Sequence, residues 1–175
     1  MSMGFELDVP VGGQTDMRAK GCVWVISEML HDLIYARAKE ALPQDYQGKE
    51  ICGLNRRFRI YQYHGGNVYR PHIDGAWPGS GIKDDQYVYN YYQDRISRLT
   101  FIIYLNEDFE GGATTFFSPH SNFGCLDTVR VRPRIGSVLC FPHGESLGAL
   151  VHEGSATTVG TKYIIRSDVL YKTQS

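Results

Sequence analysis

The chain has 175 residues and a formal net charge of −1, with 42% hydrophobic and 13% aromatic residues. This length suits about one domain and the composition is sufficient for a sizeable core, so we expect a single globular domain over residues 1–175. The near-neutral charge gives no global electrostatic signal for binding nucleic acid or an anionic membrane. Apolar runs stay shorter than the ~18 residues of a membrane span, and no secretory signal is recognisable at the N-terminus.

The cysteines, at positions 22, 52, 125 and 140, show neither CxxC spacing nor the density of a secreted disulfide scaffold. We therefore expect reduced thiols. The sequence also contains no Asn-x-Ser/Thr acceptor for glycosylation, which agrees with an intracellular protein, cytoplasmic or nuclear.

The N-terminal part predicts an arm followed by helix. Residues 1–14 carry three glycines and no persistent period, so we expect a flexible arm with a short strand around Phe5–Val9. Between residues 15 and 42 apolar side chains recur at three- and four-residue steps, which predicts a helix. Gly21 is a candidate break within it, and Pro43 ends it. We expect its apolar stripe to pack against a sheet.

Helical periodicity disappears after the linker predicted at residues 44–53, and short β-type runs begin. In the first run, Phe58–Tyr63, apolar side chains alternate with Arg59 and Gln62. Further strands are predicted around the segment that ends at Asp74 and at residues 99–105, 113–117, 128–131, 136–141, 149–152 and 162–171. One or two helices followed by about eight short strands indicate a double-sheet barrel or jelly roll, with the helices packed on one sheet.

The sequence His72-Ile-Asp74 is the first candidate for chemistry. In an extended chain, residues i and i+2 point to the same face, so His72 and Asp74 can reach one metal ion together. Iron(II) sites that activate O₂ use two histidines and one carboxylate, and they leave the opposite positions open. A second histidine must therefore come from elsewhere in the chain.

Five other histidines are available. His31 falls in the predicted helix and His64 in a turn, and we expect both on the surface. His120 and His143 lie in proline-containing loop signals. His152 precedes the strand-like run that ends the chain, and its distance from Asp74 suits two strands on opposite sides of one barrel. It is the favoured third ligand.

Three separated blocks then carry a family resemblance. They are Tyr63-His-Gly-Gly-Asn-Val-Tyr-Arg-Pro-His-Ile-Asp-Gly75, the pair Leu99–Asn106 and Glu110–Phe116, and the set Gly136–Phe141, His152–Ser155 and Gly160–Tyr163. In this order they resemble the prolyl 4-hydroxylase-like branch of the iron(II)/2-oxoglutarate-dependent dioxygenases. The resemblance runs from about residue 26 to residue 171. It implies a double-stranded β-helix in which His72, Asp74 and His152 bind iron.

The resemblance also implies a set of co-substrate residues. A basic residue ten positions after the distal histidine binds the far carboxylate of 2-oxoglutarate, and that position is Lys162. Tyr104 would reach the same carboxylate, Tyr63 would contact the co-substrate, and Thr100 would line the pocket. Fe²⁺ is the implied cofactor, 2-oxoglutarate and O₂ are the implied co-substrates, and ascorbate is a further candidate.

Arg166 offers an alternative to Lys162. It lies four residues further along the same predicted strand and on the same face, near the offset at which other branches of the superfamily place their carboxylate-binding arginine. We favour Lys162, and the opposing interpretation of Arg166 is a structural ion pair with Asp168, Asp127 or Glu107.

Residues 77–98 form an insertion that starts just after the metal-binding carboxylate. It is the best candidate for a substrate lid across the mouth of the barrel. Its aromatic residues either stack on a ring of the substrate or simply cover a hydrophobic edge; they are Trp77, Tyr87, Tyr89, Tyr91 and Tyr92.

The predicted function is hydroxylation of an unactivated C–H bond, with release of succinate and CO₂. The leading substrate is a prolyl or other residue of a protein or peptide. Alternatives are a small molecule, a nucleic acid that the near-neutral charge disfavours, a cupin-like enzyme independent of 2-oxoglutarate, and a non-catalytic metal-binding jelly-roll module. No membrane partner is expected.

Overall fold

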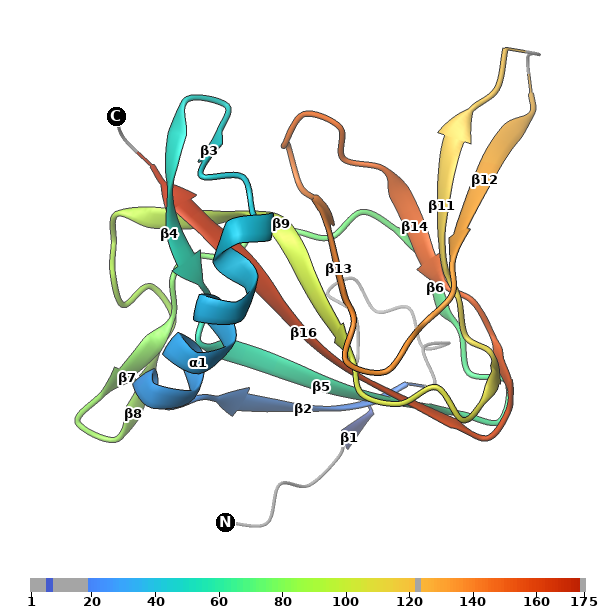
Figure 1. Ribbon diagram of the computed structural model, residues 1–175, viewed down its shortest axis with the longest axis horizontal. Coiled ribbons are helices and arrows are strands. Elements are labelled where there is room, and N and C mark those ends of the chain that lie inside the picture. Colours follow the sequence, from blue (N-terminus) through green and yellow to red (C-terminus); the bar gives the residue numbers. More distant parts are fainter. Residues whose placement is uncertain (1–5, 8–18, 122–123, 174–175) are drawn as a thin grey trace.

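The computed structural model describes residues 6–7, 19–121 and 124–173 (Figure 1). Two antiparallel sheets make up most of it, and Phe116 of one sheet packs against Phe141 of the other with ring centroids 4.9 Å apart. This confirms the predicted jelly roll. The predicted arm over residues 1–14 lies outside the described residues except for a two-residue strand, and so does the start of the predicted helix.

The larger sheet, called the major sheet here, is organised around one long strand. Its strands are β1 (Glu6–Leu7), β2 (Lys20–Val25), β3 (Asp45–Tyr46), β4 (Lys49–Leu54), β5 (Arg57–His64), β9 (Arg95–Tyr104), β13 (Val138–Pro142) and β16 (Thr161–Lys172). β16 pairs with β9 along one edge and with β5 and then β4 along the other. Its apolar residues Ile164, Val169, Leu170 and Tyr171 are buried, as expected of a central strand.

The smaller sheet, called the minor sheet here, has the order β12-β11-β14-β6. Its strands are β6 (Tyr69–His72), β11 (Thr114–Pro119), β12 (Leu126–Val131) and β14 (Val151–Gly154). The register places His72 directly opposite His152, and Phe116 opposite His152 on its other side. Directly opposite residues of an antiparallel pair share a face, so the two histidines point the same way.

Two short ribbons complete the strands: β7 (Gly81–Lys83) with β8 (Gln86–Val88), and β10 (Glu110–Gly111) with β15 (Thr157–Val159). The ribbon of β10 requires glycine at two successive positions. Gly111 has φ +75°, and a Cβ there would lie 2.2 Å from the carbonyl oxygen of Ala156. Gly112 has φ +64°, with the Lys162 side chain 3.1 Å from where its Cβ would be. The Gly-Gly pair thus lets backbone approach Lys162 closely.

The helix predicted over residues 15–42 is wrong in its first half. Residues Lys20–Val25 form β2, which pairs with β5, and Val23 lies opposite Arg59. The run contains β-branched and aromatic residues, and sheet pairing decides between two periodicities that a short apolar segment cannot separate. The helix α1 covers only Glu28–Ala38, where the Ser27 hydroxyl accepts from the backbone N–H of Leu30 at 3.3 Å, and η1 (Lys39–Ala41) follows.

The apolar stripe of α1 is buried only in part. Ile34, Tyr35 and Ala38 pack against a core cluster on the outer face of the major sheet. Met29 and Leu33 on the same helix are 73% and 52% exposed, so the expectation that the whole stripe packs on a sheet is wrong for these two positions. Among the described residues, no helix has the length and apolarity needed to cross a membrane.

The linker predicted at residues 44–53 is also wrong, because β3 and β4 form a hairpin there. Its turn uses Gln47 and Gly48, both at positive φ, and the Asp45 carboxylate accepts from the backbone N–H of Gly48 at 3.0 Å. β4 then pairs with the end of β16, where Leu54 lies opposite Val169. This pairing is a long-range contact that the local sequence does not announce.

Truncation of a core residue beneath α1 and truncation of an exposed residue on α1 should have different effects on stability. Phe101 is 1% exposed in the cluster that supports the helix, and Leu33 is 52% exposed. Replacing Phe101 with alanine should lower the free energy of unfolding by about 3–5 kcal/mol, because a cavity forms where apolar contacts were. Leu33→Ala should change it by less than about 0.5 kcal/mol. Urea denaturation measures both, and equal losses would contradict this placement of the helix.

Candidate metal and co-substrate site

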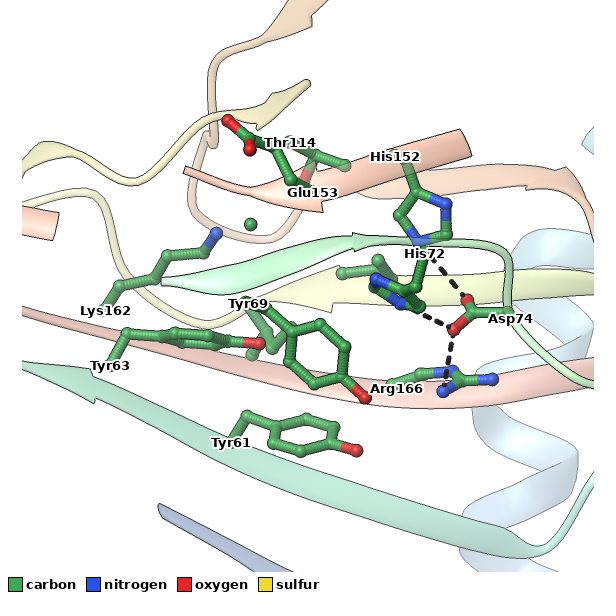
Figure 2. A pocket seen from close by; sticks show the side chains of 13 residues that line it. Tyr61, Tyr63, Tyr69, His72, Asp74, Thr114, His152, Glu153, Lys162 and Arg166 are labelled. Carbon is green, nitrogen blue, oxygen red and sulfur yellow. Dashed lines mark hydrogen bonds and ion pairs between the residues drawn. The ribbon is translucent and has the colours of Figure 1, made fainter. Parts of the chain in front are cut away.

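The three predicted metal ligands come together between the two sheets (Figure 2). His72 ends β6, Asp74 follows two residues later, and His152 lies on β14. Their coordinating atoms all lie within 4.8 Å of one another. The Nε2 of His72 is 3.1 Å from one Asp74 oxygen, and the Nε2 of His152 is 3.5 Å from the other. Asp74 and His152 are each 4% exposed.

The orientation of both imidazoles fits a cation at this point. The Nδ1 of His72 lies 2.7 Å from the carbonyl oxygen of Arg70, and the Nδ1 of His152 lies 3.3 Å from that of Leu150. A carbonyl only accepts, so each Nδ1 carries a hydrogen. Burial lowers the pKa of His152 to about 4, which leaves its Nε2 as a lone pair facing Asp74 at neutral pH. Lone pairs and a carboxylate converging on one point are the donor set of a divalent metal ion.

Asp74 is held as a carboxylate by its neighbours. Burial alone would raise its pKa, but the Arg166 guanidinium and the two histidines hold that pKa well below the usual range. One Asp74 oxygen lies 3.0 Å from Nη1 of Arg166, and the other accepts from the Thr100 hydroxyl at 2.7 Å. The side chain is therefore charged and ordered before any metal binds.

Arg166 lies between two carboxylates. Besides Asp74, its Nη2 is 3.6 Å from Asp168, one of the pairings expected from the sequence. Burial alone would lower the pKa of Arg166, whereas these two carboxylates raise it. The other two expected partners lie elsewhere: Glu107 accepts from a backbone N–H of Ile135, and Asp127 lies near His120.

Lys162 is the second buried cation of β16, with 2% of its surface exposed. Its ammonium donates to the carbonyl of Gly112 at 2.6 Å and lies 5.1 Å and 5.7 Å from the ring centroids of Tyr63 and Tyr104. Among the described residues, no carboxylate forms an ion pair with it. Burial lowers the pKa of Lys162 to about 8. A buried ammonium without an anionic partner is costly, so this position suits an anionic ligand.

One pocket joins the lysine to the metal ligands (Figure 2). Lys162 lies at one end, with His72, Asp74 and His152 at the other. Its wall comes from both sheets and includes Tyr61, Tyr63, Tyr69, Ile102, Thr114, Glu153 and Ile164. A mostly apolar pocket with a few convergent polar groups is typical of a small-molecule site.

The remaining predicted co-substrate residues differ in position. Tyr63 lines the pocket. Tyr104 is 1% exposed, and its hydroxyl shares a hydrogen bond of 2.8 Å with Thr114, which does line the pocket. Burial raises the pKa of Tyr104, so it stays a neutral phenol. Thr100 lies behind the metal ligands and contacts Asp74 rather than the pocket surface.

None of the five aromatic residues of the predicted lid lines this pocket. The ribbon of β7 and β8 lies at the opposite end of the molecule from β6 and β14 (Figure 1). The Arg57 guanidinium lies 4.3 Å from the ring centroid of Trp77, and the rings of Trp77 and Tyr89 have centroids 5.0 Å apart. The Tyr87 hydroxyl lies 3.0 Å from that of Ser80. Tyr91 contacts Tyr92 with ring centroids 4.9 Å apart.

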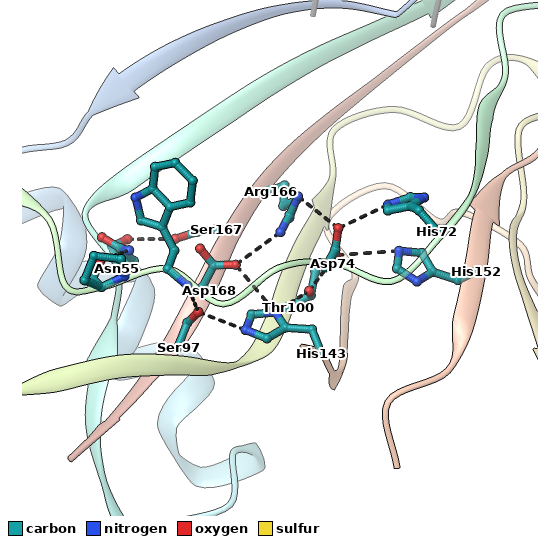
Figure 3. Close-up of polar contacts among 12 residues, drawn as sticks. Asn55, His72, Asp74, Ser97, Thr100, His143, His152, Arg166, Ser167 and Asp168 are labelled. Atoms are coloured by element: carbon teal, nitrogen blue, oxygen red, sulfur yellow. Dashed lines mark hydrogen bonds and ion pairs between the residues drawn. The ribbon is translucent and has the colours of Figure 1, made fainter. Parts of the chain in front are cut away.

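Sequence reasoning missed two groups of residues. Tyr61 and Tyr69 line the pocket, and the period of two that relates Tyr61 to Tyr63 was a usable signal. His143 was expected in a proline-containing loop, yet it is 1% exposed and hydrogen-bonded to Thr100 (Figure 3). Nothing in its local sequence indicates this contact, because the partner comes from another strand.

Comparison with known proteins agrees with this geometry. The profile of the family described as the 2OG-Fe(II) oxygenase superfamily matches residues 58–167, which include all three predicted metal ligands and Lys162. The chain belongs to the 2OG-Fe(II) oxygenase superfamily. It is therefore an iron(II)/2-oxoglutarate-dependent dioxygenase, and the family implies Fe²⁺, 2-oxoglutarate and O₂. None of the curated protein sequences compared with the chain matches it.

Solved structures of prolyl hydroxylases share the fold of this oxygenase. A prolyl hydroxylase from Trichoplax adhaerens, in complex with a hypoxia inducible factor oxygen degradation domain peptide fragment, has a TM-score of 0.62 and 17% identity, covering 96% of this chain and 70% of that one. A Pseudomonas putida prolyl-4-hydroxylase has a TM-score of 0.58 and 16% identity, covering 93% and 76%. The viral collagen prolyl hydroxylase of Paramecium Bursaria Chlorella virus-1, in its 2OG complex, has a TM-score of 0.52 and 16% identity, covering 89% and 80%.

The lowered pKa of His152 predicts a loss of stability in mild acid. Between its ordinary pKa of 6.5 and about 4, the unfolded chain binds a proton that the folded, metal-free oxygenase does not. The free energy of unfolding should therefore fall by about 3 kcal/mol from this group as pH drops through that window. Urea denaturation of the metal-free protein across these pH values measures it. His152→Gln should show a shallower fall, and an identical slope would rule out this assignment.

Proposed function

We propose that this oxygenase hydroxylates a C–H bond in a prolyl or other residue of a protein or peptide. The observation that carries the co-substrate part is Lys162, a buried cation without a carboxylate partner among the described residues, at the far end of a pocket that begins at His72, Asp74 and His152. 2-Oxoglutarate is a dicarboxylate, so its far end supplies the anion that Lys162 lacks.

The roles of the side chains follow from their contacts. His72, Asp74 and His152 would hold Fe²⁺ on one face and leave the remaining positions open. When bound, iron and 2-oxoglutarate supply the oxidation, in which one oxygen atom of O₂ enters the substrate and the other enters succinate as CO₂ leaves. The tyrosine-rich wall of the pocket orients the co-substrate and excludes water.

The choice between the two basic residues of β16 rests on their partners. Arg166 has Asp74 and Asp168 within ion-pair distance, so its charge is already compensated. A further carboxylate at Arg166 would also stand beside those two negative charges, which disfavours binding there. Lys162 is the carboxylate-binding residue in this proposal.

The substrate class is supported by a second cavity and by the structural neighbours. A cavity of about 610 Å³ adjoins the pocket, and Glu153 borders both. Arg130, Arg132 and Glu110 give it charges of both signs, and Phe109 gives it an apolar surface. This open, mixed surface lies at the Lys162 end of the pocket and suits a peptide segment distant from the reacting residue. The Trichoplax adhaerens enzyme, which shares the fold, is named as a complex with a peptide fragment.

The pKa of Lys162 predicts how co-substrate binding depends on pH. Below about pH 8 the ammonium is already protonated, so the affinity for 2-oxoglutarate should be constant. Above that pH, binding requires uptake of a proton, and the affinity should fall by about tenfold per pH unit. Calorimetric titration of the Co²⁺-loaded protein with 2-oxoglutarate between about pH 7 and about pH 9.5, a range that brackets the pKa of Lys162, measures the fall.

Lys162→Arg is the matched control for that titration. A guanidinium keeps its charge throughout the range, so any remaining affinity should be independent of pH. An equal fall in affinity in both proteins would show that the titrating group is not Lys162. Lys172→Ala removes a partly exposed lysine that already pairs with Asp94 at 2.7 Å, and it should leave the affinity for 2-oxoglutarate and its pH dependence unchanged.

Turnover itself is tested with protein purified without O₂ and then given Fe²⁺, 2-oxoglutarate, ascorbate and air. Proline-containing peptides should stimulate succinate formation and gain about 16 Da, the mass of one oxygen atom. Asp74→Ala should abolish both signals while the protein stays folded. Succinate release that no peptide stimulates would argue against a peptide substrate, and turnover retained in Asp74→Ala would reject the iron site.

A further inference from the structure

A chain of hydrogen bonds leads from the start of the 77–98 insertion to the metal ligand Asp74 (Figure 3). The backbone N–H of Trp77 donates to the Ser97 hydroxyl at 2.7 Å, and that hydroxyl lies 2.8 Å from Nε2 of His143. Nδ1 of His143 lies 2.9 Å from the Thr100 hydroxyl, which donates to Asp74 at 2.7 Å. Ser97, His143, Thr100 and Asp74 are each at most 4% exposed.

The carboxylate at the end of this chain fixes the direction of the hydrogen bonds at Thr100. The Ser97 hydroxyl accepts from the backbone N–H of Trp77, so its own hydrogen remains available for Nε2 of His143. An ionised carboxylate only accepts, so the single hydrogen of Thr100 goes to Asp74. Thr100 must then receive a hydrogen from Nδ1 of His143. Nδ1 of His143 therefore carries a hydrogen.

His143 consequently decides where the Thr100 hydrogen points. If Nδ1 carried no hydrogen, Thr100 would have one hydrogen and two acceptors, His143 and Asp74. With Nδ1 as a donor, only Asp74 competes for it. Hydrogen bonds arranged donor to acceptor in a buried chain also polarise and strengthen one another.

We propose that His143 is a positioning residue that orients the carboxylate of Asp74 for metal binding through Thr100. The inference deepens the proposed function and rests on its metal site. Thr100 holds one carboxylate oxygen, and Arg166 holds the other at 3.0 Å, so the plane of the carboxylate is fixed from both sides. Partners that orient a metal ligand in this way contribute to affinity although they never touch the metal.

Trp77, whose backbone N–H starts the hydrogen-bond chain, is itself held by neighbouring side chains. Its ring contacts both the Arg57 guanidinium and Tyr89, and these contacts hold the backbone N–H at the head of the hydrogen-bond chain in place. Asp168 lies 3.8 Å from Nδ1 of His143 and 3.6 Å from Arg166, so it adjoins both groups that position Asp74.

Two amide replacements of His143 separate its two contacts. The amide nitrogen of His143→Asn occupies the place of Nδ1 and can still donate to Thr100. The longer side chain of His143→Gln places its amide near Nε2, where it accepts from Ser97 but no longer donates to Thr100. A residue that only fills space would give the same result for both variants.

The measurement is Co²⁺ affinity by calorimetric titration, together with the ligand-field absorption of bound Co²⁺, and it requires no turnover. His143→Gln should weaken Co²⁺ binding by about 10- to 100-fold and alter the absorption, whereas His143→Asn should stay within about threefold of the unmodified protein. Equal affinities for the two variants, or His143→Gln binding like the unmodified protein, would overturn the proposal.

A second pair at Thr100 decides the question if a His143 variant does not fold. Thr100→Val removes the hydroxyl at nearly constant volume and should lose about 10- to 100-fold in Co²⁺ affinity, while Thr100→Ser should restore it. Thr115→Val is the matched control: Thr115 is 2% exposed on β11, and its hydroxyl contacts Ser155 rather than a metal ligand. Equal losses in Thr100→Val and Thr115→Val would overturn the proposal. Failure of the unmodified protein to bind Co²⁺ would instead reject the metal site itself.

Discussion

A single buried carboxylate sets the demands that the rest of this structure meets. Asp74 lies where the two sheets face each other, and its charge is stable there only because each sheet supplies a compensating group. The major sheet contributes Arg166 and the Thr100 hydroxyl, and the minor sheet contributes the imidazoles of His72 and His152. The same groups that stabilise the charge also fix its direction, so the arrangement that compensates the buried charge is also the one that the proposed metal site needs.

The period of two along β16 distributes its chemistry along the pocket. Lys162, Ile164, Arg166 and Asp168 share one face of this strand, and four residues of strand span about 13 Å. The strand thus presents two cations at opposite ends of one pocket. The difference between them is their surroundings: Arg166 faces carboxylates of the protein, whereas Lys162 faces a backbone carbonyl and two aromatic rings. This difference is why the proposed function places the anionic co-substrate at the Lys162 end.

The sequence allowed the site to be predicted where local periodicity carries the information. The i, i+2 spacing of His72 and Asp74 and the alternation in β5 and β16 follow from strand geometry alone. Prediction was wrong for β2, where a short apolar run satisfies helical and strand periods alike and pairing with β5 decides between them. The partners of Arg166 and the contact of His143 with Thr100 were open or missed for a related reason. Each depends on which strands become neighbours, and no local pattern contains that choice.

The pairing of β6 with β14 links the proposed metal binding to folding. His72 and His152 lie directly opposite each other, yet a long stretch of chain, including β9, β11, β12 and β13, separates them in sequence. Closing so long a loop has an entropic cost that the completed sheet must overcome. The face that presents both histidines therefore exists only after this non-local contact has formed. If the proposed ion binds there, part of its binding free energy is free energy of folding, and the ion links two segments that are distant in sequence.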